Sequence, residues 1–170
     1  MKKRENESYL SEVLSKLTEH KMAMVGLFVI TLEIILVVVL PFIMHLNPYD
    51  SDYTAFSAAP SGLHILGTDA IGRDIFARLV YGGRTSLLVG LLSTIISCAI
   101  GVPLGLIAGY FRGKAEIAIM RVADIFMSFP SIVLILVLVA VIGPSIWSVT
   151  IVIGVLGWTQ FARLIYANVL

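Results

Sequence analysis

The sequence has 170 residues, of which 58% are hydrophobic and 14% are charged, with a formal net charge of +1. Soluble domains carry about 25% charged residues, so this composition and a mean hydropathy of +0.97 indicate a membrane protein. The basic residues are dispersed along the chain, which argues against a nucleic-acid partner. The single cysteine, Cys98, excludes a disulfide framework within the chain.

The amino-terminal part is predicted to be a cytoplasmic segment, residues 1–21, followed by a first transmembrane span, residues 22–46. The segment is too long and too acidic for a signal-peptide n-region, and the span is long enough to cross a hydrocarbon core of about 30 Å. Pro41 is expected to kink the span near its far end. Glu33, near the middle, costs about 2.5 to 3.5 kcal/mol on insertion scales. It either packs against another helix or lies on a transport path.

An extracytoplasmic loop is predicted over residues 47–84, and it contains most of the stretch HILGTDAIGRDIFARLVYGGRTSLLVG. The arginines of this loop run against the positive-inside trend, so local carboxylates are expected to hold them. The predicted pairs join two carboxylates to three guanidinium groups: Asp69 and Asp74 to Arg73, Arg78 or Arg84. Gly67 and Gly72 are expected to allow the tight turns of a folded plug. The alternative is a loop that only links two spans.

A second span is predicted over residues 85–110, and small residues recur at every fourth position along it. The resulting ridge consists of Ser93, Ser97, Gly101, Gly105 and Gly109. Such a ridge lets another helix approach closely. The alternative is that glycine is simply common in membrane helices. Pro103 lies within the ridge and is expected to bend the helix.

The rest of the chain is predicted to cross the membrane twice more. The segments are a cytoplasmic turn at 111–117, a third span at 118–142, an extracytoplasmic turn at 143–144, a fourth span at 145–163 and a cytoplasmic end at 164–170. Residues 114–127 are alternatively an amphipathic interfacial helix that feeds the third span. Arg121 and Asp124 share a helix face and are expected to pair. Pro130 is expected to break the helix that follows them.

The sequence carries no recognisable catalytic or metal-binding constellation. The segment GYFRGKA, residues 109–115, lacks the glycine spacing and the Ser or Thr of a phosphate loop. The three histidines, His20, His45 and His64, are far apart and have no acidic residue at metal-ligand helical spacing. No GxSxG elbow presents a nucleophile. We therefore predict neither an enzyme nor a cofactor or metal in this chain.

The stretch that begins at His64 resembles the hallmark of one permease subunit of ABC importers for dipeptides, oligopeptides and nickel. That hallmark has the form H-P-L-G-T-D-x-x-G-R-D-x-x-S-R-L-x-x-G-x-R-x-S-L, from which Ile65 and Ala77 depart mildly. The hallmark residues expected to shape the loop and to contact a partner are Gly67, Thr68, Asp69, Gly72, Arg73, Asp74, Arg78 and Arg84. The resemblance extends along essentially the whole chain, although Tyr166 stands where the family often has arginine.

The resemblance implies an all-α, polytopic transmembrane bundle, with four spans here of an expected six. Residues 85–170 would form part of an ABC transmembrane type-1 domain. The implied complex is a type I importer in the cell membrane of a prokaryote. Its other parts would be a second permease, two ATPases that hold ATP and Mg²⁺, and an extracytoplasmic binding protein. The substrate, whether peptide, nickel or another small solute, is not fixed by the hallmark.

Two further readings remain at this point. The loop that docks on the ATPases in this family does not occur before Leu170, so we expect either an amino-terminal fragment of a longer permease or a truncated gene product. In the truncated case, the chain would be a four-span interaction protein that binds a partner permease through the ridge of small residues without coupling to ATP. A secondary transporter is a weaker alternative, because inverted repeats are not evident.

Overall fold

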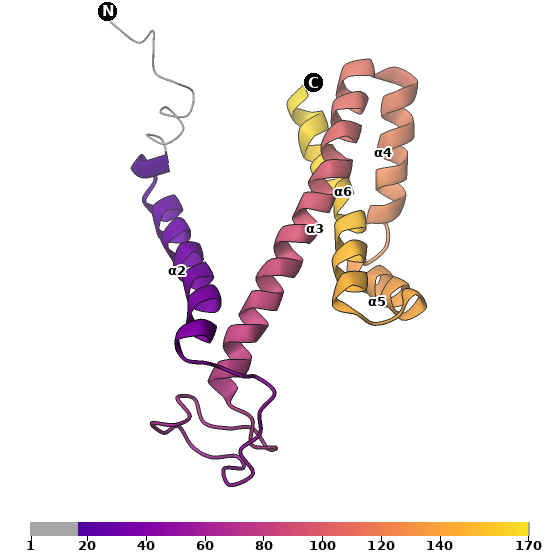
Figure 1. The fold of residues 1–170 in the computed structure, drawn as a ribbon. Helices are drawn as coiled ribbons and strands as arrows, with labels where there is room; N and C mark the ends of the chain where they lie inside the picture. Colours follow the sequence, from indigo (N-terminus) through magenta and orange to yellow (C-terminus); the bar gives the residue numbers. More distant parts are fainter. Residues whose placement is uncertain (1–16, 170) are drawn as a thin grey trace, which may run out of the picture. The chain divides into compact units, whose positions relative to one another are not determined.

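The computed structural model describes residues 17–169, which are helical apart from one long loop and short connections (Figure 1). The named helices are α2 (Lys21–Ile43), α3 (Ile75–Phe111), α4 (Gly113–Met127), α5 (Ser131–Ile142) and α6 (Ile146–Val169). The chain divides into two compact units, Met1–Arg84 and Thr85–Leu170. In the part of the chain described, three helices are long and apolar enough to cross a membrane, or four if α4 and α5 count as one broken span. The predicted all-α, multi-span class is confirmed.

Helix α2 is apolar on all sides, as expected of a helix that faces lipid. Only Val37 and Pro41 are buried among its side chains. Val37 lies where α3 comes close, because a Cβ added at Gly83 would be 2.9 Å from the Val37 Cγ1. The helix continues past Pro41 and ends at Ile43, a little before the predicted end of the span at residue 46.

Helix α3 begins at Ile75, before the predicted start of the second span at residue 85, so the last part of the predicted loop over 47–84 is helical. The physical reason is a cap. The Asp74 Oδ1 accepts a 2.8 Å hydrogen bond from the backbone N–H of Ala77, which satisfies one of the free donors in the first turn of α3. With 37 residues, α3 is about 55 Å long and exceeds the hydrocarbon thickness. It continues as one helix through Pro103.

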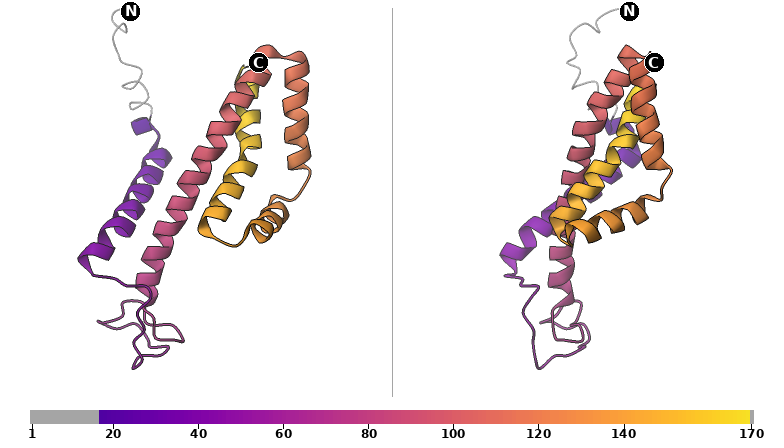
Figure 2. Two further views of the ribbon diagram at one scale, coloured as in Figure 1. Left: turned by 45° about the vertical axis from the view of Figure 1, so that its right-hand side comes forward. Right: turned by 90° about the vertical axis from the view of Figure 1, so that its right-hand side faces the viewer.

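The predicted third span is broken into α4 and α5, whose axes differ by 85°. Figure 2 shows α5 turning away from the direction of α4. The break contains Pro130, which has no N–H to donate and disfavours helical geometry at the residue before it. The segment over 118–142 is therefore not one straight helix, and α4 with α5 forms either a broken span or a re-entrant loop. The alternative of a separate helix over 114–127 matches α4. The predicted turn at 111–117 shrinks to Arg112, the one non-helical residue between α3 and α4.

Helix α6 packs directly against the ridge of small residues on α3. A Cβ added at Gly101 would lie 2.5 Å from the backbone oxygen of Trp158, and one at Gly105 would lie 2.6 Å from that of Ala162. The Ser97 Oγ donates a 2.8 Å hydrogen bond to the backbone oxygen of Gly154. Small residues on both helices thus bring the two backbones together.

This packing corrects one prediction. The ridge is covered by α6 of the same chain, so the expectation that the ridge itself binds a partner permease is wrong. Helix α6 continues to Val169, beyond the predicted end of the fourth span at residue 163, and its last turns cover the end of the ridge. There, Val169 lies within 2.8 Å of a Cβ added at Gly109.

Gly105→Ala should destabilise the packing of α3 on α6, because the new methyl group meets the α6 backbone and not a flexible side chain. We expect a loss of about 1 to 3 kcal/mol in the free energy of unfolding, measured by thermal unfolding of the purified protein in detergent. Gly90→Ala is the matched control on the same helix, since nothing lies within 4 Å of its added Cβ. That variant should be as stable as the wild type or slightly more stable. Equal stability of the two variants would contradict the close approach.

Candidate functional site

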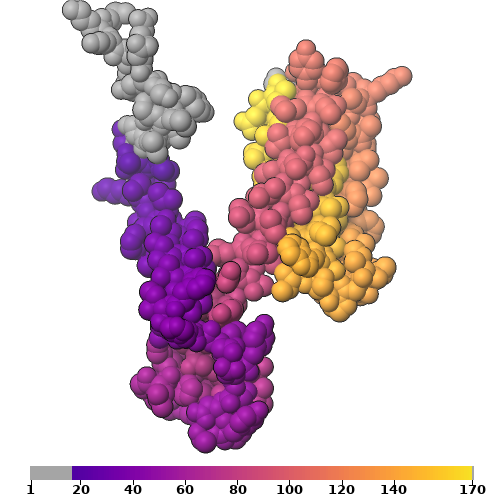
Figure 3. All heavy atoms as spheres, in the orientation of Figure 1, coloured from indigo at the N-terminus to yellow at the C-terminus, as the bar shows by residue number. Residues whose placement is uncertain are grey.

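The loop between α2 and α3 is a folded body rather than a slack connection. Isolated antiparallel bridges join Ser51 to Arg73 and Thr68 to Asp74. The Ser57 N–H donates to the Asp69 backbone oxygen at 2.9 Å, and the Ile75 N–H donates to the Gly67 backbone oxygen at 3.1 Å. Figure 3 shows the loop side chains packed closely together beyond the end of α2. The last turn of the loop is thereby tied to the first residue of α3.

Two hallmark glycines occupy positions that a side chain would disrupt. Gly67 has φ +77° and Gly72 has φ +79°, in the left-handed region that favours glycine. A Cβ at Gly67 would collide with the backbone oxygen of Ala58, and one at Gly72 would collide with that of Asp52. Both glycines therefore combine a tight turn with a close approach of distant backbone.

Thr68 forms the buried centre of this loop, with only 4% of its surface exposed. Its hydroxyl donates to the backbone oxygen of Ala55 and accepts a 2.9 Å hydrogen bond from the N–H of Ala58. One side chain thus satisfies two backbone groups on the opposite side of the loop. The hallmark pattern marked Thr68, but the sequence did not reveal this role.

Asp69 gathers the positive charges of the loop. Its Oδ2 lies 2.8 Å from the Nε of Arg73 and 3.3 Å from the Nη1 of Arg78. Its Oδ1 accepts hydrogen bonds of 3.0 Å from the backbone N–H groups of Ile71 and Arg73. The bond from the Arg73 N–H, with smaller contributions from the others, lowers the pKa of this carboxyl. For Asp69, the structure shows the pairing that the sequence predicted.

Asp74 forms no ion pair with an arginine among residues 17–169, and that part of the prediction is wrong. One of its oxygens caps α3, and the other lies 2.8 Å from the Nδ1 of His64. The Nε2 of His64 lies 3.6 Å from Asp52. Arg84 is exposed at the end of the first unit and forms no salt bridge with the described residues. These contacts of His64 were not predicted from the sequence, although its place as the first residue of the hallmark was an available signal.

The two acidic residues of α4 contact side chains of α6. Asp124 forms an ion pair with Arg163, and the Tyr166 hydroxyl donates to Glu116. The predicted pair between Arg121 and Asp124 is therefore wrong. Arg121 instead lines, together with these four residues, an open pocket of about 510 Å³.

Glu33 is exposed on α2, and it forms no ion pair with the described residues 17–84 of its own unit. Among residues 17–169, no group of three His, Cys, Asp or Glu side chains has the arrangement of a metal site. The folded loop carries ion-paired side chains that remain partly exposed, such as those of Arg73 and Asp69.

Two family models match separate parts of the chain, in the expected order. Residues 8–60 match the N-terminal TM domain of oligopeptide transport permease C, and residues 101–170 match the binding-protein-dependent transport system inner membrane component. The chain belongs to this family of permeases. This family comprises inner membrane components of binding-protein-dependent transport systems.

Curated relatives support the same assignment along nearly the whole chain. The glutathione transport system permease protein GsiD of Pectobacterium atrosepticum is 37% identical over 91% of this chain and 51% of its own length. The dipeptide transport system permease protein DppC of Bacillus subtilis is 33% identical, over 99% and 52%. The oligopeptide transport system permease protein OppC of Haemophilus influenzae is 36% identical, over 98% and 54%. The chain thus spans about half the length of the curated relatives it matches.

Thr68→Val should loosen the loop while keeping its shape. The hydroxyl is lost, so the N–H of Ala58 and the carbonyl of Ala55 lose their partner, at a cost of about 1 to 3 kcal/mol. We expect faster hydrogen exchange at residues 51–74, measured by mass spectrometry on the protein in detergent. Thr68→Ser keeps the hydroxyl and should exchange at nearly the wild-type rate. Unchanged exchange in Thr68→Val would show that the hydroxyl does not hold the loop.

Proposed function

We propose that this chain forms, together with a second permease subunit, the transmembrane path of an ATP-driven importer for dipeptides, oligopeptides or a related small solute. The observation that carries the proposal concerns the loop over residues 44–74, which contains the first part of the hallmark and is called the hallmark loop below. This loop is folded and leads directly into the long apolar helix α3. The names of the relatives, which refer to dipeptide, oligopeptide and glutathione transport, support a small peptide substrate. Nickel, which the hallmark also allowed, has no counterpart among those names.

The mechanism proposed is alternating access without covalent chemistry on this chain. An extracytoplasmic binding protein delivers the substrate, and two ATPase subunits bind ATP and Mg²⁺ on the cytoplasmic side. ATP drives the cycle because it binds one conformation of the complex more tightly than the other. In this chain, the close packing of α3 on α6 keeps two spans together as a unit, while the hallmark loop gives a folded surface outside the membrane.

Uptake measurements in the bacterium that carries the gene test this proposal. Deleting the gene should abolish uptake of a labelled dipeptide or tripeptide, and the wild-type gene should restore it. A tagged chain should co-purify with a second permease and with ATPases. Labelled nickel serves as the parallel substrate. If the chain co-purifies with a permease while uptake of both solutes is unchanged in the deletion strain, the chain is instead a non-transporting interaction protein that binds its partner through a surface other than the ridge.

The proposal also places the hallmark loop outside the cell and the turn between α3 and α4 in the cytoplasm, following the positive-inside trend. A Cys98→Ala background removes the one native thiol. Ala59 in the loop and Lys114 after α3 are both exposed on the protein, so only the membrane should decide which introduced thiol reacts. In intact cells, a membrane-impermeant maleimide should then label Ala59→Cys but not Lys114→Cys. Lysis should expose Lys114→Cys to the reagent. The reverse labelling pattern would overturn the orientation.

A further inference from the structure

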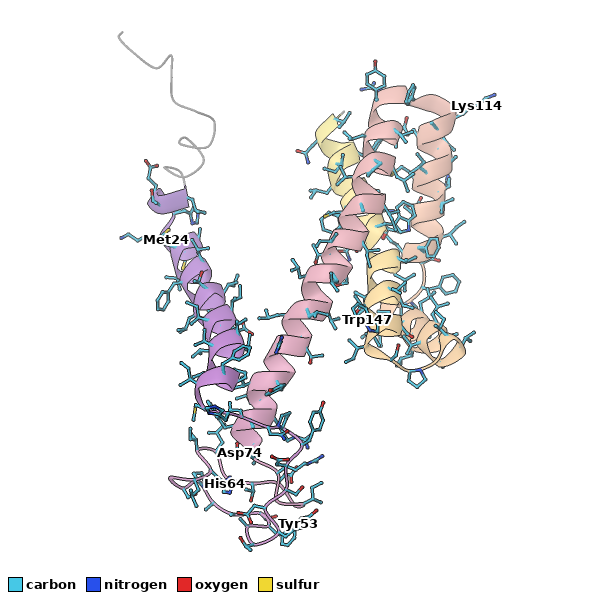
Figure 4. The ribbon with its side chains drawn as sticks, viewed as in Figure 1. Met24, Tyr53, His64, Asp74, Lys114 and Trp147 are labelled. Atoms are coloured by element: carbon cyan, nitrogen blue, oxygen red, sulfur yellow. The ribbon has the colours of Figure 1, made fainter. Side chains whose placement is uncertain are left out.

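His64 lies between two carboxylates that belong to different parts of the loop. Its Nδ1 is 2.8 Å from Asp74, the residue that caps α3, and its Nε2 is 3.6 Å from Asp52, near the start of the loop. Figure 4 labels His64 in the loop beside Asp74, with Tyr53 further from the helix. The imidazole is half-buried, with 18% of its side chain exposed. One ring thus joins the two ends of the loop.

The two carboxylates need two donors from the ring, and only the charged form supplies them. An imidazolium carries a proton on both nitrogens, whereas a neutral imidazole carries one. The short distance to Asp74 keeps that single proton on Nδ1 in the neutral form. The Nε2 lone pair then faces the oxygen of Asp52 without a proton between them.

The arginines near His64 are paired with Asp69 and not with Asp52 or Asp74. Two arginines of the loop region, Arg73 and Arg78, both form ion pairs with Asp69. Asp52 accepts hydrogen bonds from the N–H and hydroxyl of Thr54, at 2.8 Å and 2.5 Å. These bonds are neutral, so the positive charge that faces both Asp52 and Asp74 is that of protonated His64.

We propose that His64 is a protonation-dependent clasp: its imidazolium holds Asp52 and the α3 cap Asp74 together, and its deprotonation releases Asp52 and loosens the loop. The loosening is local. The N–H of Asp52 still donates to the backbone oxygen of Gly72 at 2.9 Å, and the Thr68 hydrogen bonds do not depend on the ring. The residues on either side of Asp52 should lose the most protection, because they are next to the contact that is released.

The direction of the pH dependence follows from the neighbours of the ring. The hydrogen bond to Asp74 and, to a lesser degree, the nearby carboxylate of Asp52 raise the pKa of His64 above its usual value. A group whose pKa is raised in the folded state stabilises that state fully below its unfolded pKa of about 6.5. The stabilisation is lost as the pH rises through the folded pKa. The loop should therefore be tightest in mildly acidic solution and looser in alkaline solution.

Two measurements on the full chain in lipid nanodiscs test the clasp. The first is NMR titration of ring-labelled histidine from about pH 5.5 to 8.5, with the His64 signal assigned by its loss in His64→Gln. The second is hydrogen exchange of residues 51–74 over the same range, corrected for the intrinsic pH dependence of exchange. We expect the His64 midpoint to lie above about 6.5, and loop protection to fall about twofold or more across that midpoint.

Three variants make the result decisive. Asp52→Asn keeps an acceptor for Thr54 but removes the charge, so it should lower the His64 midpoint and flatten the pH dependence of loop protection. His64→Gln should exchange at every pH as the wild type does in alkaline solution. His20→Gln is the matched control, because His20 is exposed and its side chain does not cap α2. It should keep the wild-type profile.

The clasp is overturned by a His64 midpoint at or below about 6.5, or by loop protection in the wild type that does not vary with pH. It is also overturned if His64→Gln keeps the wild-type profile. None of these readouts involves transport, so the clasp and the proposed transport function stand or fall separately.

Discussion

The cap of α3 by Asp74 is the constraint on which the architecture of the loop depends. A helix begins where its first free N–H groups find an acceptor, and Asp74 supplies that acceptor to Ala77. The same residue forms a bridge with Thr68 and binds His64 through its other oxygen. One carboxylate therefore ends the loop, begins the long helix and orients the ring that reaches the start of the loop. Its negative charge at the helix amino terminus also complements the helix dipole.

In the second unit, packing relies on small residues because lipid removes the usual hydrophobic driving force between helices. The backbones of α3 and α6 meet at Gly101, Gly105 and Gly154, where any side chain would force them apart. Trp158 then covers the edge of this contact and meets Phe126 of α4 edge-on, with ring centroids 6.2 Å apart. The position of α6 on α3 therefore depends on the absence of side chains at these glycines as well as on the contacts of the larger side chains.

The sequence predicted the features that depend on local spacing. Hydropathy located the apolar helices, the four-residue repeat from Ser93 to Gly109 located a packing surface, and the proximity of Asp69 to Arg73 predicted their pairing. Hydropathy did not predict the start of α3, because it detects only the apolar stretch. The first turns of α3 are less apolar, and the helix begins there because Asp74 caps it.

The features that the sequence did not predict depend on contacts between distant residues. Asp124 pairs with Arg163, 39 positions away, and not with its helical neighbour Arg121. His64 and Asp74 are ten positions apart in a loop without regular periodicity. The two kinds of contact also differ in strength. The approach of α3 to α6 buries glycine backbone, whereas the Asp124–Arg163 pair is nearly half exposed on both sides, where an ion pair contributes little in water. Helix α4 is therefore held to α6 mainly by the buried contacts around Ala123, and the break at Pro130 frees α5 to follow a different direction from α4.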